Sequence, residues 1–242
     1  MGALTGKVAV VTGASSGIGR AIALGLAAEA AAVCPVGRNP ERLSAVADAA
    51  RATSPRVVPL QADLTDDAQL DALVESLRGE FPAIDVLVLS AGEHARGTIE
   101  DSGVAQLDRL YRSNVRAHYR LLQCLLPLLK AGGGYVVFVN SSVGLNAPRD
   151  AGPFAATQHA VKALADSLRQ EVNVDGVRVL NVFLGRVATP RQEKIYSGQE
   201  WTYQPELLLQ PEDVAAMVLA ALSLPRTAEV TELHIRPAIK SY

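Results

Sequence analysis

Short apolar runs alternate with longer amphipathic segments along the whole chain. The apolar runs are rich in β-branched residues and do not alternate apolar with polar positions, which is typical of parallel strands buried on both faces. We expect seven strands, at Val8–Val11, Ala32–Val36, Val57–Leu60, Val86–Leu89, Tyr135–Val139, Val177–Phe183 and Val230–Ile235.

The segments between these runs carry apolar residues at helical spacing. Two of them begin with a proline after a polar residue, at Asn39-Pro40 and Gln210-Pro211, and proline suits the first turn of a helix. The glycines at 132–134 indicate the end of the longest segment. We expect helices over Gly17–Ala30, Pro40–Ala52, Asp66–Arg78, Asp101–Ala131, Pro153–Val172 and Pro211–Leu222.

This alternation predicts an α/β fold of the Rossmann type: a doubly wound, mostly parallel, seven-stranded sheet with helices on both faces. No linker, repeat or low-complexity segment interrupts the series, so residues 1–242 are interpreted as a single domain. Residues 187–210 lack a clean period and carry Tyr196, Trp201 and Tyr203. Long loops at the carboxyl end of a strand can close over ligands, so this segment is a candidate substrate lid. The alternative is that the aromatics pack the segment onto the body.

Composition and charge exclude several classes of protein. Of the 242 residues, 49% are hydrophobic, and the formal net charge is −2, so neither a disordered chain nor a nucleic-acid or anionic-membrane partner is expected. No apolar run approaches the ~18 residues of a membrane span, and no signal-peptide region is visible. The isolated cysteines, Cys34 and Cys124, suit a reducing cytosol, and no metal-ligand spacing occurs among Cys and His. We therefore expect a cytoplasmic protein without a metal site.

A glycine-rich loop, Thr-Gly-Ala-Ser-Ser-Gly-Ile-Gly at residues 12–19, lies between the first strand and the first helix. Glycines there let the backbone approach a pyrophosphate, which then meets the free N–H groups at the start of the helix. Ordinary turn glycines are the alternative, but the strand–loop–helix context favours a dinucleotide site. The residues expected to bind its phosphates are Gly13, Ser15, Ser16, Gly17, Ile18 and Gly19.

The end of the second strand indicates which dinucleotide is bound. An Asp or Glu there would bind a ribose 2′-hydroxyl, whereas an Arg accommodates a 2′-phosphate. Arg38 occupies this position, and no acidic residue appears before Glu41. The sequence therefore predicts NADP(H) rather than NAD(H), with a solvated strand-end arginine as the alternative.

These motifs resemble those of the short-chain dehydrogenase/reductase family, and the resemblance covers nearly the whole chain. The glycine loop matches in full, Asp63 matches the aspartate that contacts adenine, and residues 90–92 match an Asn-Ala-Gly motif with Ser in place of Asn. Residues 184–189 match Pro-Gly-x-x-x-Thr with Leu in place of Pro. The resemblance implies cofactor contacts for Asp63, Leu64, Ser90, Ala91, Gly92, Gly185, Val187 and Thr189.

The active-site segment departs from the family pattern. The resemblance implies that Asn114 and Ser141 are the family's active-site Asn and Ser, which would polarise a substrate. The family's Tyr transfers a proton, and its Lys lowers the pKa of that Tyr and holds the nicotinamide ribose. Phe154 and Gln158 stand at these two positions, and Gln158 could still bond the ribose. We therefore expect a preserved cofactor pocket with disabled proton transfer, so that ketone reduction is weak or absent.

Other groups could supply the proton. For each of them, the alternative is a surface residue or one that packs locally without a role in proton transfer. Lys162 lies one helical turn, ~5.4 Å, beyond the family lysine position, which is too far for ordinary ribose contacts. His94 follows the fourth strand, where ligand crevices open in α/β folds, and its ordinary pKa suits proton transfer. His159 points to another side of its helix. Glu93 and Arg186 could orient a polar substrate.

Three functional interpretations stay open. The first is an NADP(H)-dependent oxidoreductase that acts on a carbonyl or alcohol, or on an imine, where hydride transfer to an iminium ion needs no tyrosine proton. The second is a non-catalytic NADP(H)-binding sensor or inactive partner subunit, and the third is an engineered inactive form. The substrate or ligand is expected to be a small molecule of unknown class, and the resemblance implies a homodimer or homotetramer.

Overall fold

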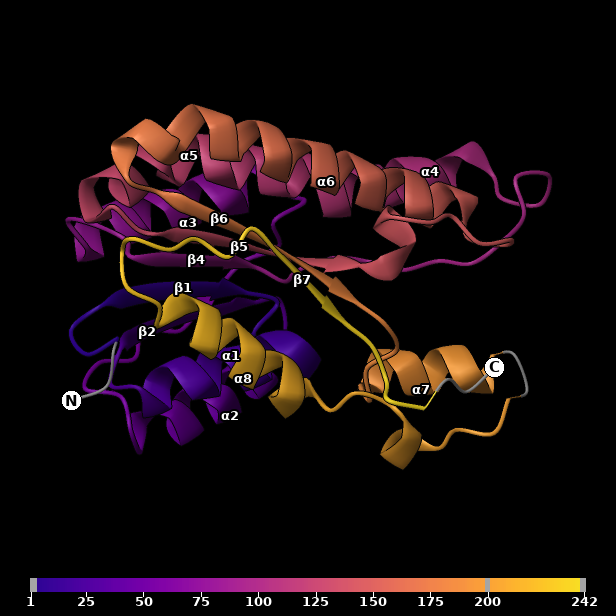
Figure 1. Cartoon of the computed structure of the whole chain (residues 1–242), viewed down its shortest axis with the longest axis horizontal. Helices are drawn as coiled ribbons and strands as arrows, with labels where there is room; N and C mark the ends of the chain where they lie inside the picture. Colours follow the sequence, from indigo (N-terminus) through magenta and orange to yellow (C-terminus); the bar gives the residue numbers. More distant parts are fainter. Residues whose placement is uncertain (1–3, 199–200, 240–242) are drawn as a thin grey trace.

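Seven strands form one parallel sheet in the order β3-β2-β1-β4-β5-β6-β7 (Figure 1). The structure is a computed structural model that describes residues 4–198 and 201–239. Every strand pair is parallel, so the predicted Rossmann-type fold is confirmed. The strands are β1 (Val8–Thr12), β2 (Ala32–Gly37), β3 (Leu60–Gln61), β4 (Val86–Leu89), β5 (Tyr135–Ser141), β6 (Arg178–Leu184) and β7 (Glu232–Ile235).

Helices cover both faces of this sheet (Figure 1). Helices α1, α2 and α8 pack on one face, and α3, α5 and α6 pack on the other. None of the helices in the described part of the chain is long and apolar enough to cross a membrane. Their bounds are α1 (Gly17–Ala28), α2 (Pro40–Arg51), α3 (Asp67–Glu80), α4 (Val104–Tyr111), α5 (Ala117–Gly132), α6 (Gly152–Val172), α7 (Pro190–Ser197) and α8 (Pro211–Leu222).

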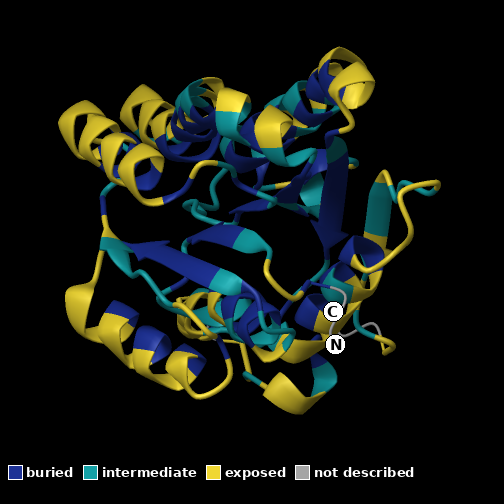
Figure 2. Ribbon diagram, turned by 90° about the vertical axis from the view of Figure 1, so that its left-hand side faces the viewer, coloured by how far each residue is buried: buried dark blue, intermediate teal, exposed yellow. Residues whose placement is uncertain are grey.

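Successive residues of each central strand enter opposite cores. Ala9 and Val11 of β1 pack in the core under α1 and α8, whereas Val10 between them packs in the core under α3 and α5. Figure 2 shows the resulting arrangement, with buried strands between helices whose outer faces are exposed. Because both sides of the pleat are covered, the strands contain continuous apolar runs rather than an alternating pattern.

Two predicted elements differ from the structure. The long helix expected over 101–131 is divided into α4 and α5 by a π-helical turn, Arg112–Arg116. Such a turn widens the helix locally and is common at functional sites. The third strand is confined to two residues, and Val57, expected to begin it, makes only an isolated bridge to Val33.

The segment over 187–210, in which the sequence shows no clean period, contains helix α7. Thr189 caps this helix, because its side-chain oxygen accepts a hydrogen bond from the Gln192 N–H at 3.2 Å, and Pro190 occupies the first turn. Val187 pairs with Leu209, so the segment leaves the sheet and returns to the place where it began. Residues 199 and 200 of the predicted lid lie outside the described residues.

Candidate functional site

A cleft of about 650 Å³ opens at the carboxyl ends of the central strands. Ligands of doubly wound folds bind at this edge, where the chain order reverses on either side of β1. The cleft is lined by all the residues predicted to form a site: Gly13, Ser15, Ser16, Gly17, Ile18, Gly19, Arg38, Asp63, Leu64, Ser90, Ala91, Gly92, Asn114, Ser141, Phe154, Gln158, Gly185, Val187 and Thr189.

Thr12 joins the two strands that flank the point of reversal. Its buried hydroxyl donates to the Val88 carbonyl at 3.1 Å and accepts from the N–H groups of Ser90 and Ala91 at 3.0 and 3.2 Å. The side chain thus satisfies backbone groups that strand pairing leaves open where β4 ends. This contact holds the Ser90–Gly92 loop against the glycine loop.

The glycine loop is packed too closely for side chains at two positions. A Cβ at Gly13, whose φ is +66°, would lie 2.8 Å from the Ala91 nitrogen, and a Cβ at Gly19 would lie 2.5 Å from the Gly13 carbonyl oxygen. Within the described residues, the first turn of α1 has no capping side chain and no acidic residue, unlike that of α2 or α3. Its N–H groups therefore remain available to an anion in the cleft.

Arg38 lies at the mouth of the cleft between two carboxylates. Its Nη1 atom is 3.6 Å from Asp63 Oδ2 and 3.8 Å from Glu93 Oε1, and the side chain is 63% exposed. Burial opposes ionisation of Asp63, but hydrogen bonds from Thr65 and the charge of Arg38 hold its pKa below the usual value. Arg42, on the first turn of α2, lines the same part of the cleft and adds a second cation.

Asn114 is held in the π-helical turn by buried hydrogen bonds. Its Oδ1 accepts from the Glu93 N–H at 2.7 Å, and its Nδ2 donates to the Glu93 carbonyl at 3.0 Å and to Thr157 Oγ1 at 3.1 Å. Thr157 in turn donates to the Phe154 carbonyl at 2.8 Å. The network links the β4 loop, the π-helical turn and α6, and leaves Asn114 only 2% exposed.

Ser141 and Gln158 lie where the end of β5 meets α6. The Asn140 side chain donates to the Gln158 carbonyl at 3.2 Å and accepts from the Ser141 N–H at 2.7 Å. Ser141 is half-buried, with its hydroxyl 3.4 Å from the Val143 nitrogen, and Gln158 is buried. The Gln158 amide nitrogen approaches Thr157 Oγ1 at 3.5 Å. Both residues line the cleft.

Phe154 and His94 form an aromatic pair in the cleft wall. Their ring centroids are 4.7 Å apart in an edge-to-face arrangement. Burial, together with the positive charges of Arg191 and Arg96, lowers the pKa of His94 to about 4, so the imidazole is neutral at pH 7.

Two alternative groups considered for proton transfer are engaged elsewhere. Lys162 donates to Asp166 at 2.6 Å and lies 3.3 Å from Glu232, and it does not line the cleft. His159 is exposed, with its Nδ1 2.9 Å from the Ala155 carbonyl one turn earlier in α6.

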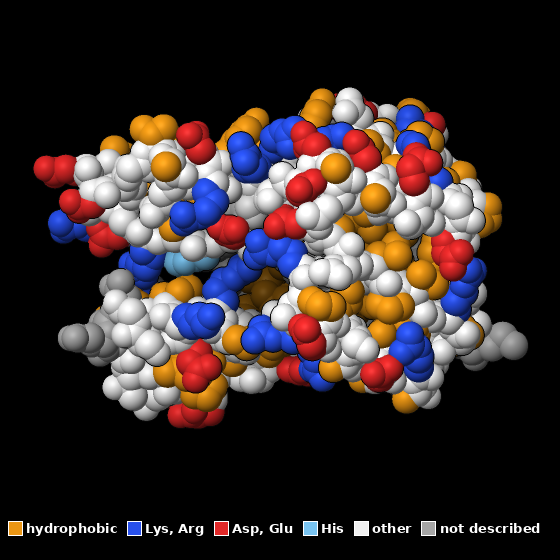
Figure 3. All heavy atoms as spheres, turned by 180° about the vertical axis from the view of Figure 1, so that it is seen from behind, with side chains coloured by type: hydrophobic (Ala, Val, Ile, Leu, Met, Phe, Trp, Pro, Cys, Tyr) orange, Lys and Arg blue, Asp and Glu red, His pale blue; other side chains and the backbone are white. Residues whose placement is uncertain are grey.

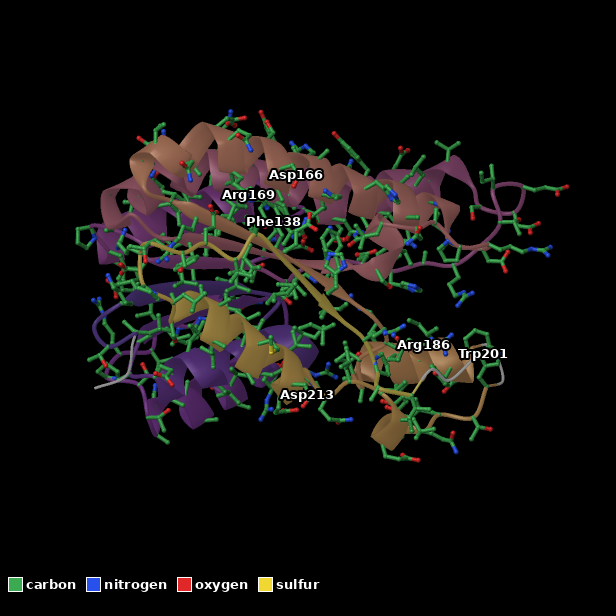
Figure 4. All side chains as sticks on the ribbon, viewed as in Figure 1. Phe138, Asp166, Arg169, Arg186, Trp201 and Asp213 are labelled. Atoms are coloured by element: carbon green, nitrogen blue, oxygen red, sulfur yellow. The ribbon has the colours of Figure 1, made fainter. Side chains whose placement is uncertain are left out.

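Glu93 and Arg186 both line the cleft. The Glu93 carboxylate accepts from Arg109 Nε at 3.0 Å, so this acid is bound to cations on two sides. Arg186 donates to the Tyr196 hydroxyl at 3.0 Å and stacks on Trp201, at the end of the molecule that contains α7 (Figure 4). Tyr196 also meets Trp201 and Tyr203 edge-on, so the three aromatics of this segment pack on one another.

The sequence reasoning missed several cleft residues. Arg191 crosses from α7 to the β4 loop, where its Nη2 donates to the Gly92 carbonyl at 2.6 Å. Arg96 stacks on Trp201, and buried His118 approaches the Ala91 carbonyl at 2.8 Å with Nε2. The signal for Arg191 was its place two residues after Thr189 in a matched motif, but no local pattern pairs Arg96 with Trp201. Among residues 4–198 and 201–239, no group of three or more His, Cys, Asp or Glu could hold a metal ion.

Comparison with known proteins places the chain in a family. Residues 7–200 match the short chain dehydrogenase family. An uncharacterized oxidoreductase of Staphylococcus epidermidis is 35% identical over 232 residues, which cover 96% of this chain and 97% of the relative. One from Staphylococcus aureus is 34% identical over 238 residues, which cover 98% and 100% of the two chains.

Solved structures share the fold over nearly the full length. L-sorbose reductase from Gluconobacter frateurii, complexed with NADPH and L-sorbose, superposes with a TM-score of 0.89 at 28% identity and covers 97% of each chain. An alcohol dehydrogenase from the archaeon Thermococcus sibiricus, complexed with 5-hydroxy-NADP, gives 0.87 at 28% identity over 98% of each chain. The chain therefore belongs to the short-chain dehydrogenase/reductase family.

Proposed function

We propose that this protein binds NADP(H) and is an oxidoreductase by descent in which the tyrosine–lysine proton relay is replaced by Phe154 and Gln158. The observation that carries the proposal is the cleft itself, about 650 Å³ in volume, which is lined by the glycine loop and Arg38 as well as by Phe154 and Gln158. Ketone reduction is then slow or absent, whereas cofactor binding is retained.

The residues at the first end of the cleft fit a cofactor that carries phosphates. The open N–H groups of α1 suit a pyrophosphate, and Arg38 and Arg42 are two cations beside the end of β2, where a 2′-phosphate belongs. A guanidinium presents a planar fork of donors to phosphate oxygens. NADP(H) and NADPH complexes of proteins with the same fold support this assignment.

The residues at the second end determine what chemistry remains. Bound NADPH would supply a hydride, and Ser141 and Asn114 would lie on the side where the substrate oxygen is polarised. Phe154 has no hydroxyl to transfer a proton, and the neutral Gln158 cannot lower the pKa of a neighbouring phenol. A positioned acid or base typically contributes 10²–10⁴-fold to a rate, so its loss slows carbonyl reduction by roughly that factor. The reduction of a substrate that needs no proton from this position, such as an iminium ion, is not slowed in this way.

A second candidate function is a non-catalytic NADP(H)-binding sensor or partner subunit. The contact between His94 and Phe154 favours it, because the imidazole occupies space beside the position of the family tyrosine. Turnover on imine substrates distinguishes the two candidates, since a sensor gives none.

The cofactor assignment is tested by following NADPH fluorescence during titration with wild type and with Arg38→Asp. Reversing the charge beside the 2′-phosphate should weaken NADPH binding by at least about 10-fold, and it should not weaken NADH binding, because an Asp at this position can accept a hydrogen bond from the ribose 2′-hydroxyl. Arg51→Asp, on the exposed end of α2, is the matched control and should bind NADPH like wild type. No NADPH binding by the wild type, or equal effects of the two variants, would overturn the assignment.

The homodimer or homotetramer and the cytoplasmic location stay predictions. Helices α4 and α5 expose Val104, Leu107, Tyr111 and Tyr119, which are apolar or amphipathic side chains suited to an interface. Sedimentation velocity of wild type and Leu107→Glu tests self-association through this face.

A further inference from the structure

The first turn of α7 packs against the glycine loop. Thr189, which caps this helix, has its Cγ2 atom 3.1 Å from the place where a Cβ on Gly17 would lie. Gly17 is the first residue of α1, and the N–H groups of that first turn are open. Pro190 and Arg191 are the first two residues of α7. The start of α7 therefore brings Arg191 close to the site assigned to the phosphates.

The side chain of Arg191 extends from α7 to the loop that follows β4. Its Nη2 atom donates to the Gly92 carbonyl at 2.6 Å. The preceding residue, Ala91, touches the glycine loop, since a Cβ on Gly13 would lie 2.8 Å from the Ala91 nitrogen. Because consecutive Cα atoms are only about 3.8 Å apart, the guanidinium bound to Gly92 lies near the glycine loop as well. Figure 3 shows Lys and Arg side chains gathered around a hollow on one face of the molecule.

The charge of Arg191 is not neutralised by a carboxylate. Among residues 4–198 and 201–239 it forms no ion pair, and its hydrogen bond to Gly92 goes to a neutral carbonyl. The side chain is exposed to the cleft that it lines, yet the surrounding walls desolvate it, and this lowers its pKa although the nearby Glu93 favours the charged form. A partly desolvated cation without a counter-ion is unfavourable, and an anion bound beside it would remove that cost.

We propose that Arg191 binds the pyrophosphate of the dinucleotide. Its guanidinium would reach the phosphate oxygens from α7, while the open N–H groups of α1 bind them from the glycine loop. Helix α7 would then hold the cofactor as well as cover the cleft. This inference deepens the proposed function and rests on it, because a pyrophosphate lies there only when a dinucleotide is bound.

The neighbours of Arg191 favour the pyrophosphate over the 2′-phosphate. Arg38 and Arg42 lie beside the end of β2, where a 2′-phosphate belongs, whereas Arg191 bonds Gly92 and its helix packs on Gly17. A guanidinium has five N–H donors in a planar fork, so one bond to a carbonyl leaves others for phosphate oxygens. The pyrophosphate is common to NADPH and NADH, and only NADPH has the 2′-phosphate. Arg191 should therefore strengthen the binding of both dinucleotides without selecting between them.

Titrations with NADPH and with NADH, followed by the fluorescence of the reduced nicotinamide, test this role. Arg191→Gln should weaken the binding of both by a similar factor of about 10-fold, so that the ratio of the two Kd values stays that of wild type. Arg38→Asp should change that ratio. The loss in Arg191→Gln should shrink between about 50 and 500 mM NaCl, because salt screens the attraction between guanidinium and phosphate. Arg191→Lys keeps the charge without the fork and should lose less than Arg191→Gln.

Two controls separate a contact with the pyrophosphate from a general effect on α7. Lys194→Gln removes an exposed cation of the same helix that does not line the cleft, and this variant should bind NADPH like wild type. Adenosine 2′-monophosphate has the 2′-phosphate but no pyrophosphate. It should displace NADPH from wild type and from Arg191→Gln with the same affinity of its own.

Four results would overturn the proposal. They are NADPH binding by Arg191→Gln as tight as that of wild type, a loss confined to NADPH, an equal loss for adenosine 2′-monophosphate, and a loss that salt does not change. Failure of the proposed function is recognised separately, because the wild type then binds no NADPH. If the wild type binds NADPH and Arg38→Asp changes the ratio of the two Kd values, but Arg191→Gln changes neither, only the contact with the pyrophosphate is refuted.

Discussion

The imidazole of His94 meets the ring of Phe154 edge-on, with centroids 4.7 Å apart and planes inclined by 64°. The pair lies in the cleft wall, and the proposed function places the family's tyrosine at the position of Phe154. A hydroxyl added to Phe154 would enter a cleft that is already lined by Ser141 and Asn114. Phe154 has the aromatic volume of a tyrosine but carries no hydroxyl.

Restoring the relay should therefore restore ketone reduction. In Phe154→Tyr/Gln158→Lys, the phenol regains a proton to transfer and the lysine regains the charge that lowers its pKa. We expect NADPH oxidation with a reactive ketone to rise by about 10²-fold or more over wild type. The single variants, each lacking one half of the relay, serve as controls and should gain much less. Wild-type turnover as fast as that of the double variant would show that another group already supplies the proton.

Removing the negative charge beside Arg38 should strengthen cofactor binding. Glu93 lies 3.8 Å from Arg38 Nη1 and competes with a phosphate for it. Because the pair is exposed and screened by salt, we expect Glu93→Gln to tighten NADPH binding only about 2- to 5-fold, and less at high ionic strength. Glu75→Gln, which breaks an exposed ion pair with Arg78 on α3, should have no effect in the same titration. If Glu93→Gln binds NADPH more weakly than wild type, the ion pair of Glu93 with Arg109 contributes more to cofactor binding than the negative charge beside Arg38 subtracts from it.

The sheet and the meeting of the glycine loop with the Ser90–Gly92 loop could be predicted because both depend on local patterns. The apolar runs specify strands covered on both faces, and the carboxyl ends of parallel strands share one edge of the sheet. The loops that follow β1 and β4 therefore had to meet, as Thr12 and Ala91 do at 3.2 Å.

The end of the cleft near Trp201 could not be predicted in the same way. Arg96 and Trp201 come together only through the packing of two long loops, and no periodicity reports such a contact. The π-helical turn at Asn114 inserts a widened turn into a segment with an ordinary helical pattern, so its apolar spacing alone indicated one long helix. Helix α7 is short and mostly exposed, which left little apolar periodicity to detect.

Acidification should destabilise the fold through His118. Burial lowers its pKa from 6.5 to about 4, against a smaller opposing effect of the Ala91 carbonyl. Between these two pH values, His118 binds a proton in the unfolded chain but not in the folded chain. The contribution of His118 to the free energy of unfolding is therefore fully present above pH 6.5 and is lost as the pH falls toward 4. His118→Gln keeps a donor for Ala91 and removes the titration.

The measurement compares urea unfolding of wild type and His118→Gln at pH 7 and pH 5. The loss of stability on acidification should be smaller in the variant, by up to about 2 kcal/mol. His159→Gln, at an exposed imidazole on α6, should lose as much stability as wild type. If His118→Gln loses as much stability on acidification as wild type, His118 is not the titrating group.

The hydrogen bond between Asn114 and Thr157 gives the last prediction. Thr157→Val preserves the shape of the side chain but removes the buried acceptor that lies 3.1 Å from Asn114 Nδ2. A buried donor left without a partner typically costs about 1–3 kcal/mol, and we expect urea unfolding to show a loss of this size. Thr53→Val, at an exposed threonine after α2, controls for the substitution itself and should change stability by less than about 0.5 kcal/mol. If both variants unfold at the same urea concentration, the network does not fix Asn114, and the Glu93 carbonyl alone is sufficient to hold its amide in the π-helical turn.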